Sequence, residues 1–139
     1  MGAQTAIFTR TYDETLSMIV EARNYMAHLD PRVSRRRRGG EDLHFSCEAL
    51  RVTSRLTQVM AWLMLQRAVV YGEISPEEAC LEGNRLSGRD VCLDTNSMDD
   101  DSLPAGLRSL LTRSYRLYQR VSRLEEMVLV RVGVARTIN

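Results

Sequence analysis

The stretch that decides the fold runs from Glu41 to Tyr71, and its second half reads RVTSRLTQVMAWLMLQRAVVY (residues 51–71). One helical face of this stretch follows alternating steps of four and three residues: Phe45, Ala49, Val52, Leu56, Val59, Leu63, Gln66 and Val70. This spacing is typical of a helix that packs against other helices. No proline or glycine interrupts it, so we predict a continuous helix over residues 41–71, ~45 Å long.

The segment from residue 59 to residue 70 is apolar on its other faces as well, for example at Met60, Met64 and Val69. A helix that is hydrophobic nearly all round must be covered on most of its sides. We expect the following residues to lie in the core or in a dimer interface: Leu56, Val59, Trp62, Leu63 and Val70.

Composition indicates one ordinary globular domain. The chain has 139 residues, 44% of them hydrophobic, and a net charge of +1. This length allows a real core. The longest strictly apolar run, residues 59–65, is far shorter than the ~20 residues of a membrane span. The N-terminus lacks a signal-peptide pattern, and three cysteines suit reduced thiols better than disulfides. A soluble cytoplasmic protein is expected.

A shorter helix is predicted upstream, from about residue 12 to residue 29. Asp30-Pro31 ends it, because proline disfavours the helical conformation in the residue before it. The connector to the central helix contains two glycines after four adjacent arginines: Arg35, Arg36, Arg37 and Arg38. It is either a contact for nucleic acid or an acidic partner or, as we favour, a solvated loop between antiparallel helices.

Downstream, the sequence predicts a short helix, a flexible loop and a last long helix. Ser75-Pro76-Glu77-Glu78 has the features of a capped helix start, which indicates a helix over about residues 76–82. Residues 83–101 are rich in turn formers and predict a flexible loop. The last helix, about residues 103–132, repeats the steps of four and three. Beside its apolar face it carries a basic stripe: Arg113, Arg116, Arg120 and Arg123.

These elements predict an all-α fold, with one domain over residues 1–139. The expected architecture is an antiparallel, up-down-up three-helix bundle with a short extra helix and a long flexible loop. The first helix, ~25 Å long, would cover about half of the central helix and leave residues 59–70 partly bare. An apolar patch of that size is unusual on a soluble monomer, so we expect a homodimer that buries it.

Patterns of catalytic and cofactor-binding residues are weak. No nucleophile elbow, P-loop or dinucleotide fingerprint is present. His44 and Cys47, one helical turn apart, could supply two metal ligands, but Cys80 and Cys92 do not complete a recognisable site. We predict a protein with no enzymatic activity, no cofactor and no metal.

A nucleic-acid-binding helical regulator is the alternative. Arg51 and Arg55 lie one turn apart on the central helix and could form a basic face with the connector and the basic stripe. However, 18 acidic residues offset these charges and no helix-turn-helix pattern is present. Arg51 and Arg55 can also pair with Glu48 and with other acidic residues. Nucleic-acid binding is therefore the weaker hypothesis.

The central stretch also resembles a known family through the pattern ExxRxTxRLxQxxAWLxxxRAVxxGEIS (residues 48–75). This pattern is similar to the most characteristic segment of the RcdA family, the regulators of CtrA degradation in alpha-class proteobacteria. The resemblance implies a dimeric three-helix bundle without enzymatic activity, which acts as an adaptor for the ClpXP protease. The partners that it implies are ClpX, a response-regulator adaptor, a cyclic-di-GMP-binding adaptor and substrate regulators such as CtrA.

An adaptor needs accessible contact surfaces on a rigid scaffold. The candidates are the arginine connector at residues 35–38, the loop at residues 83–101 and the basic stripe. We expect the stripe, together with Arg51 and Arg55, to make the charged contacts with partners.

Overall fold

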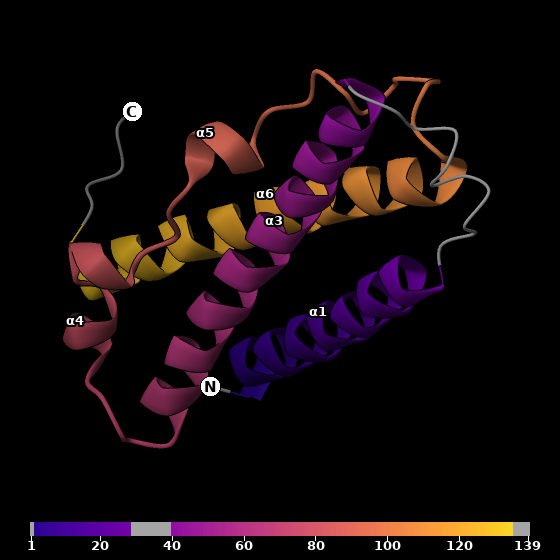
Figure 1. Cartoon of the computed structure of the whole chain (residues 1–139). Helices are drawn as coiled ribbons and strands as arrows, with labels where there is room; N and C mark the ends of the chain where they lie inside the picture. Colours follow the sequence, from indigo (N-terminus) through magenta and orange to yellow (C-terminus); the bar gives the residue numbers. More distant parts are fainter. Residues whose placement is uncertain (1, 29–39, 135–139) are drawn as a thin grey trace.

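The computed structural model describes residues 2–28 and 40–134, with side chains described from residue 43 onward in the second range. Its regular elements are helices: α1 (Gly2–Ala27), α3 (Gly40–Val70), α4 (Pro76–Ala79), the 3-10 helix η1 (Glu82–Asn84), α5 (Arg89–Cys92) and α6 (Ala105–Val132). Helices α1, α3 and α6 are long, and α4 and α5 lie on the connection between α3 and α6 (Figure 1). The predicted all-α class is confirmed.

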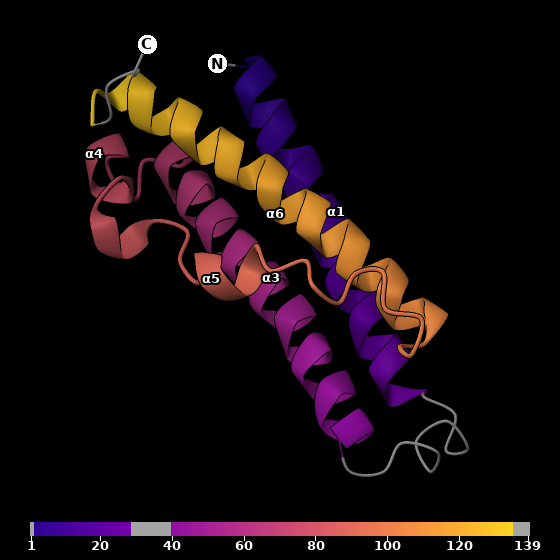
Figure 2. The ribbon, with the colours of Figure 1, turned by 90° about the horizontal axis from the view of Figure 1, so that it is seen from above.

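The directions of the helices differ from the up-down-up prediction. Ion pairs join Glu21 to Arg113 and Glu14 to Arg120, so α1 and α6 run antiparallel. Helix α1 is also antiparallel to α3, and α3 and α6 therefore run in the same direction (Figure 2). Residues 71–104 must accordingly carry the chain back along the bundle before α6 can begin.

Helix α1 begins at Gly2 rather than near residue 12. The additional turns are useful to the core because the Phe8 ring packs edge-on against Trp62, with the ring centroids 5.7 Å apart. Polar residues on this helix are also accommodated inside, since the Thr11 and Thr15 hydroxyls donate to backbone carbonyls four residues earlier. The sequence prediction stopped short because it followed the strongest apolar spacing only.

The longer α1 removes the length mismatch that motivated the homodimer. Val59, Trp62 and Leu63 are buried within the chain itself, as is Leu56, whereas Val70 is 51% exposed. The expectation that residues 59–70 would stand partly bare holds only at a few positions, such as Met64 and Val70, which are exposed. The homodimer itself stays a prediction.

The short helix is also smaller than predicted. Ser75 does cap it, because its hydroxyl accepts a hydrogen bond from the Glu78 backbone N–H at 3.0 Å. Helix α4 nevertheless ends at Ala79, and η1 follows from Glu82. The chain turns here toward the far end of the bundle.

Residues 83–101, predicted to be a flexible loop, contain the end of η1 and all of α5 and are hydrogen-bonded along α3. We call residues 86–101 the return segment. At one end the Ser87 backbone N–H donates to Gln58 Oε1 at 3.0 Å. At the other end His44 Nε2 lies 2.9 Å from Asp100 Oδ2. The α3 side chains that contact the segment lie on one helical face, at steps of seven, four and three residues: His44, Arg51, Arg55 and Gln58.

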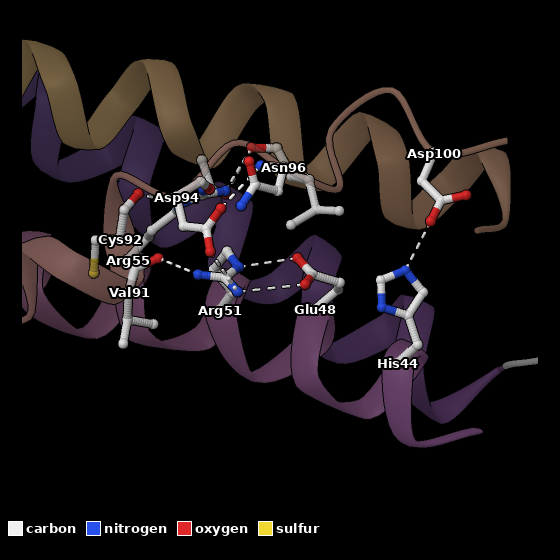
Figure 3. Close-up of polar contacts among 11 residues, drawn as sticks. His44, Glu48, Arg51, Arg55, Val91, Cys92, Asp94, Asn96 and Asp100 are labelled. Carbon is white, nitrogen blue, oxygen red and sulfur yellow. Dashed lines mark hydrogen bonds and ion pairs between the residues drawn. The ribbon is translucent and has the colours of Figure 1, made fainter. Parts of the chain in front are cut away.

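Arg55 is the centre of these contacts and is fully buried. Its Nε donates to the Cys92 carbonyl at 2.7 Å and its Nη2 to the Asp94 carbonyl at 2.8 Å (Figure 3). Its Nη1 donates to the Leu111 carbonyl on α6 at 2.8 Å. A buried charge is costly unless its donors are satisfied, and here backbone carbonyls satisfy them. One side chain thereby joins α3, the return segment and α6.

Helix α6 binds the return segment from its other side. Glu125 Oε2 accepts a hydrogen bond from the Leu86 backbone N–H at 2.7 Å, and the Tyr118 hydroxyl donates to the Ser87 carbonyl at 3.1 Å. Burial raises the pKa of Glu125, and it raises the pKa of Tyr118 to about 12. These contacts place the segment in the groove between α3 and α6.

Replacing Arg55 should destabilise the whole fold. In Arg55→Met the three carbonyls lose a buried donor, and each buried polar group left without a partner costs about 1–3 kcal/mol. Arg113→Met is the matched control, because both side chains of its ion pair with Glu21 are about half exposed and such a pair is worth about 0–1 kcal/mol. Urea unfolding followed by circular dichroism measures both losses. Equal losses for the two variants would contradict the role assigned to Arg55.

The contact at Asp100 should make stability depend on acidity. The Ser102 hydroxyl and backbone N–H, and then His44, lower the pKa of Asp100 from 3.8 to about 2. A carboxyl whose pKa is lower in the folded chain stabilises the fold above its ordinary pKa, and this contribution is lost as the pH falls toward the lowered value. Between pH 4 and pH 2, the urea midpoint should therefore fall less in Asp100→Asn than in the wild type. Asp99→Asn, at the exposed neighbouring position, should follow the wild type; identical profiles for all three chains would refute the assignment.

Candidate protein-interaction surface

Two general features of the described chain bear on the kind of site to expect. Within residues 2–28 and 40–134, no three His, Cys, Asp or Glu side chains gather in a way that could hold a metal ion. His44 contacts Asp100, while Cys47 is exposed. No described helix has the length and apolar character needed to cross a membrane. The candidates left by the sequence are the loop at residues 83–101, which is hydrogen-bonded to α3, and the arginine-rich surfaces.

The structure moves the central-helix arginines from the surface to the interior. Arg55 is buried, and burial lowers its pKa, as does the positive charge of Arg51. Arg51 is 16% exposed; its Nε lies 2.9 Å from Glu48 Oε2 and its Nη2 lies 3.4 Å from Asp94 Oδ2. Figure 3 shows this set side by side on α3 and the return segment. The hypothesis that Arg51 and Arg55 present charge to a partner is therefore corrected: they hold the fold together.

The four connector arginines fall outside the described residues: Arg35, Arg36, Arg37 and Arg38. The basic stripe on α6 is described in full.

Two arginines of the stripe are paired with glutamates of α1. Arg113 holds Glu21 through two hydrogen bonds of 2.6 and 2.7 Å, and Arg120 holds Glu14 through two of 2.8 and 2.9 Å. The Arg113 guanidinium lowers the pKa of Glu21.

The other two stripe residues remain open to solvent. Arg116 and Arg123 are exposed, and no hydrogen bond or ion pair links either of them to another side chain in the described ranges. A two-pronged arginine–carboxylate pair has fixed geometry, so Arg113 and Arg120 are positioned while Arg116, between them, is free. Arg113 and Arg120 are thus held in ion pairs with α1, whereas Arg116 and Arg123 are exposed and can meet a partner.

The stripe borders a groove between α1 and α6. Its central part has a volume of 320 Å³ and a mixed charged lining: Glu14, Ser17, Met18, Glu21, Arg113, Arg116 and Arg120. A wider part of 710 Å³ lies toward Tyr25 and Gly106. Farther along the same two helices lies a mostly apolar part of 350 Å³, which Ile7 and Met127 line together with Gln4 and Arg131, among others. The groove therefore changes from charged to apolar along its length.

The acidic partners of the stripe were not predicted from the sequence. Glu14 and Glu21 are seven residues apart, as are Arg113 and Arg120. Matching intervals of two helical turns on two helices are the signal that could have identified the pairs. A notch of 250 Å³ between α1 and α3 was not predicted either; there the Arg67 guanidinium lies over the rings of Tyr12 and Tyr71.

Comparisons with known proteins identify the fold and the family. Residues 1–137 match the family described as "Protein of unknown function (DUF1465)". Among solved structures, the crystal structure of RcdA from Caulobacter crescentus CB15 is similar, with a TM-score of 0.69 and 35% sequence identity. The similarity covers 88% of this chain and 91% of that chain. No curated protein matches.

The family match spans almost the whole chain, and the RcdA structure supports it at an identity well above the level at which only the fold is shared. The resemblance first noted in residues 48–75 thus extends over all three long helices. The chain belongs to the RcdA family, which the sequence model describes as DUF1465.

Proposed function

We propose that this chain is a non-enzymatic adaptor that promotes ClpXP-mediated proteolysis of cell-cycle transcriptional regulators such as CtrA. The observation that carries the proposal is the similarity to RcdA over 88% of the chain, which supports a regulator or adaptor role. The expected partners are ClpX, response-regulator and cyclic-di-GMP-binding adaptors, and the substrate regulators. A homodimer acting in the cytoplasm is part of the same proposal.

The distribution of charge is consistent with this role. Arg55 bonds to buried carbonyls and Arg51 pairs with Glu48 inside the fold. Arg113 and Arg120 hold α1 against α6. Arg116 and Arg123 are exposed on the outside of a rigid bundle. A rigid scaffold with a few free charges can recognise a protein partner with little loss of conformational entropy.

The same distribution disfavours the nucleic-acid alternative. Affinity for nucleic acid grows with the number of phosphates that arginine and lysine neutralise. Four of the six arginines proposed within the described residues are already bonded to carboxylates or to backbone carbonyls: Arg51, Arg55, Arg113 and Arg120. The remaining charges are few for that purpose.

A reconstituted degradation reaction tests the adaptor function. It contains ClpXP, ATP, a purified CtrA-type regulator and the two auxiliary adaptors, with and without this chain. Addition of the chain should accelerate loss of the regulator severalfold, and a pull-down with the tagged chain should recover ClpX or one of the adaptors. An unchanged degradation rate together with salt-sensitive recovery of nucleic acid alone would overturn the proposal in favour of the alternative.

A further inference from the structure

Helix α6 has a second regular face, beside the one that packs into the core. Its members are all exposed and follow steps of four, three, four and three residues: Arg116, Arg120, Arg123, Met127 and Val130. Such spacing marks one continuous line along a helix. This outer line borders the groove between α1 and α6, because Arg116 and Arg120 line its central part and Met127 lines its apolar part.

The C-terminal half of the outer line is apolar. Met127 is 59% exposed and Val130 is 44% exposed. Across the groove on α1, Ile7 is 45% exposed and lines the same cavity as Met127. Large apolar side chains that gather at one end of a groove indicate a contact that removes them from water.

The N-terminal half of the outer line is basic. Glu14 already neutralises Arg120, which leaves Arg116 and Arg123 as its free charges. They are seven residues apart, and this separation corresponds to ~10 Å along the helix. Two carboxylates on one face of another helix, also seven residues apart, would match them.

We propose that the outer line binds one amphipathic helix of a protein partner, about 15 residues long. The helix carries two acidic residues seven positions apart in its first half and apolar residues on the same face in its second half. The length follows from the span from Arg116 to Val130, which is ~21 Å. The acidic half comes first because carboxylates stabilise a helix near its N-terminus. The partner helix therefore runs parallel to α6 and antiparallel to α1.

A second copy of the chain is a poorer occupant of this face. Two copies related by a two-fold axis present the same surface to each other. With the axis near Arg123, the two Arg123 side chains would meet, and Arg116 of each copy would face Val130 of the other. Like charges in contact and a guanidinium against an apolar side chain both oppose association.

A binding experiment with the full chain tests this inference. The probe is a fluorescent, helix-stabilised synthetic peptide with two glutamates seven residues apart, followed four and seven residues later by leucines. Anisotropy titrations should give saturable binding that weakens about tenfold in the Arg116→Glu/Arg123→Glu variant and in Met127→Glu. A peptide with lysine in place of glutamate should bind weakly to the wild type and better to the charge-reversed variant.

Matched substitutions away from the groove serve as controls. Arg23→Glu reverses an exposed arginine beside the α1–α3 cavity, and Leu81→Glu charges an apolar residue that is 60% exposed. Both should bind the peptide as the wild type does. Equal binding by groove and control variants, or no saturable binding at all, would overturn the inference. A wild-type dimer that Met127→Glu converts to a monomer in light scattering would also overturn it, since a second copy would then be the occupant.

This inference rests on the proposed adaptor function only for the biological role of the partner, and the two can fail separately. If the chain accelerates degradation by ClpXP but does not bind the peptide, the adaptor function stands and the helix-binding role of the groove is refuted. If the chain binds the peptide through the groove but leaves degradation unchanged, the helix-binding role stands and the adaptor function is refuted.

Discussion

The rest of the structure depends on the need to satisfy the buried guanidinium of Arg55. A positive charge in the interior is tolerated only where acceptors surround it, and these acceptors are carbonyls of the return segment and of α6. Two of them, the carbonyls of Cys92 and Asp94, are in place because the chain runs back along α3 after the end of that helix. This return accounts for the long connection between two helices that point the same way.

The return segment in turn decides which surfaces remain open. It covers the groove between α3 and α6, where it meets Gln58 on one helix and Glu125 on the other. Helix α1 closes the bundle from the other side and is fixed to α6 by two ion pairs. The groove between α1 and α6 stays free, and the free arginines and exposed apolar residues of α6 lie along it. The same sequence element, a row of arginines on α6, thus fixes α1 through Arg113 and Arg120 and also supplies the free charges to which we assign a partner contact.

Features that depend on neighbouring residues could be predicted from the sequence, and features that depend on contacts between distant residues could not. Steps of four and three residues are local, and α3 and α6 accordingly lie within two residues of their predicted bounds at each end. Helix direction is not local: it is set by contacts between helices, such as the pairs Glu21–Arg113 and Glu14–Arg120, whose order makes α6 antiparallel to α1. For the same reason residues 83–101 were predicted to be flexible, since their order comes from side chains of α3 rather than from their own turn-forming residues. Arginine is usually exposed, which is why a buried Arg55 was mistaken for a partner contact.

The most direct test of this account is hydrogen exchange of the return segment in the unmodified chain, followed residue by residue by NMR. The backbone N–H groups of Leu86, Cys92 and Leu93 all donate hydrogen bonds. If Arg55 holds the segment as part of the fold, these amides open only with the global unfolding of the protein, and their opening free energy equals that of the middle of α3. Exchange at the rate of an unstructured peptide, with α3 still protected, would contradict the account.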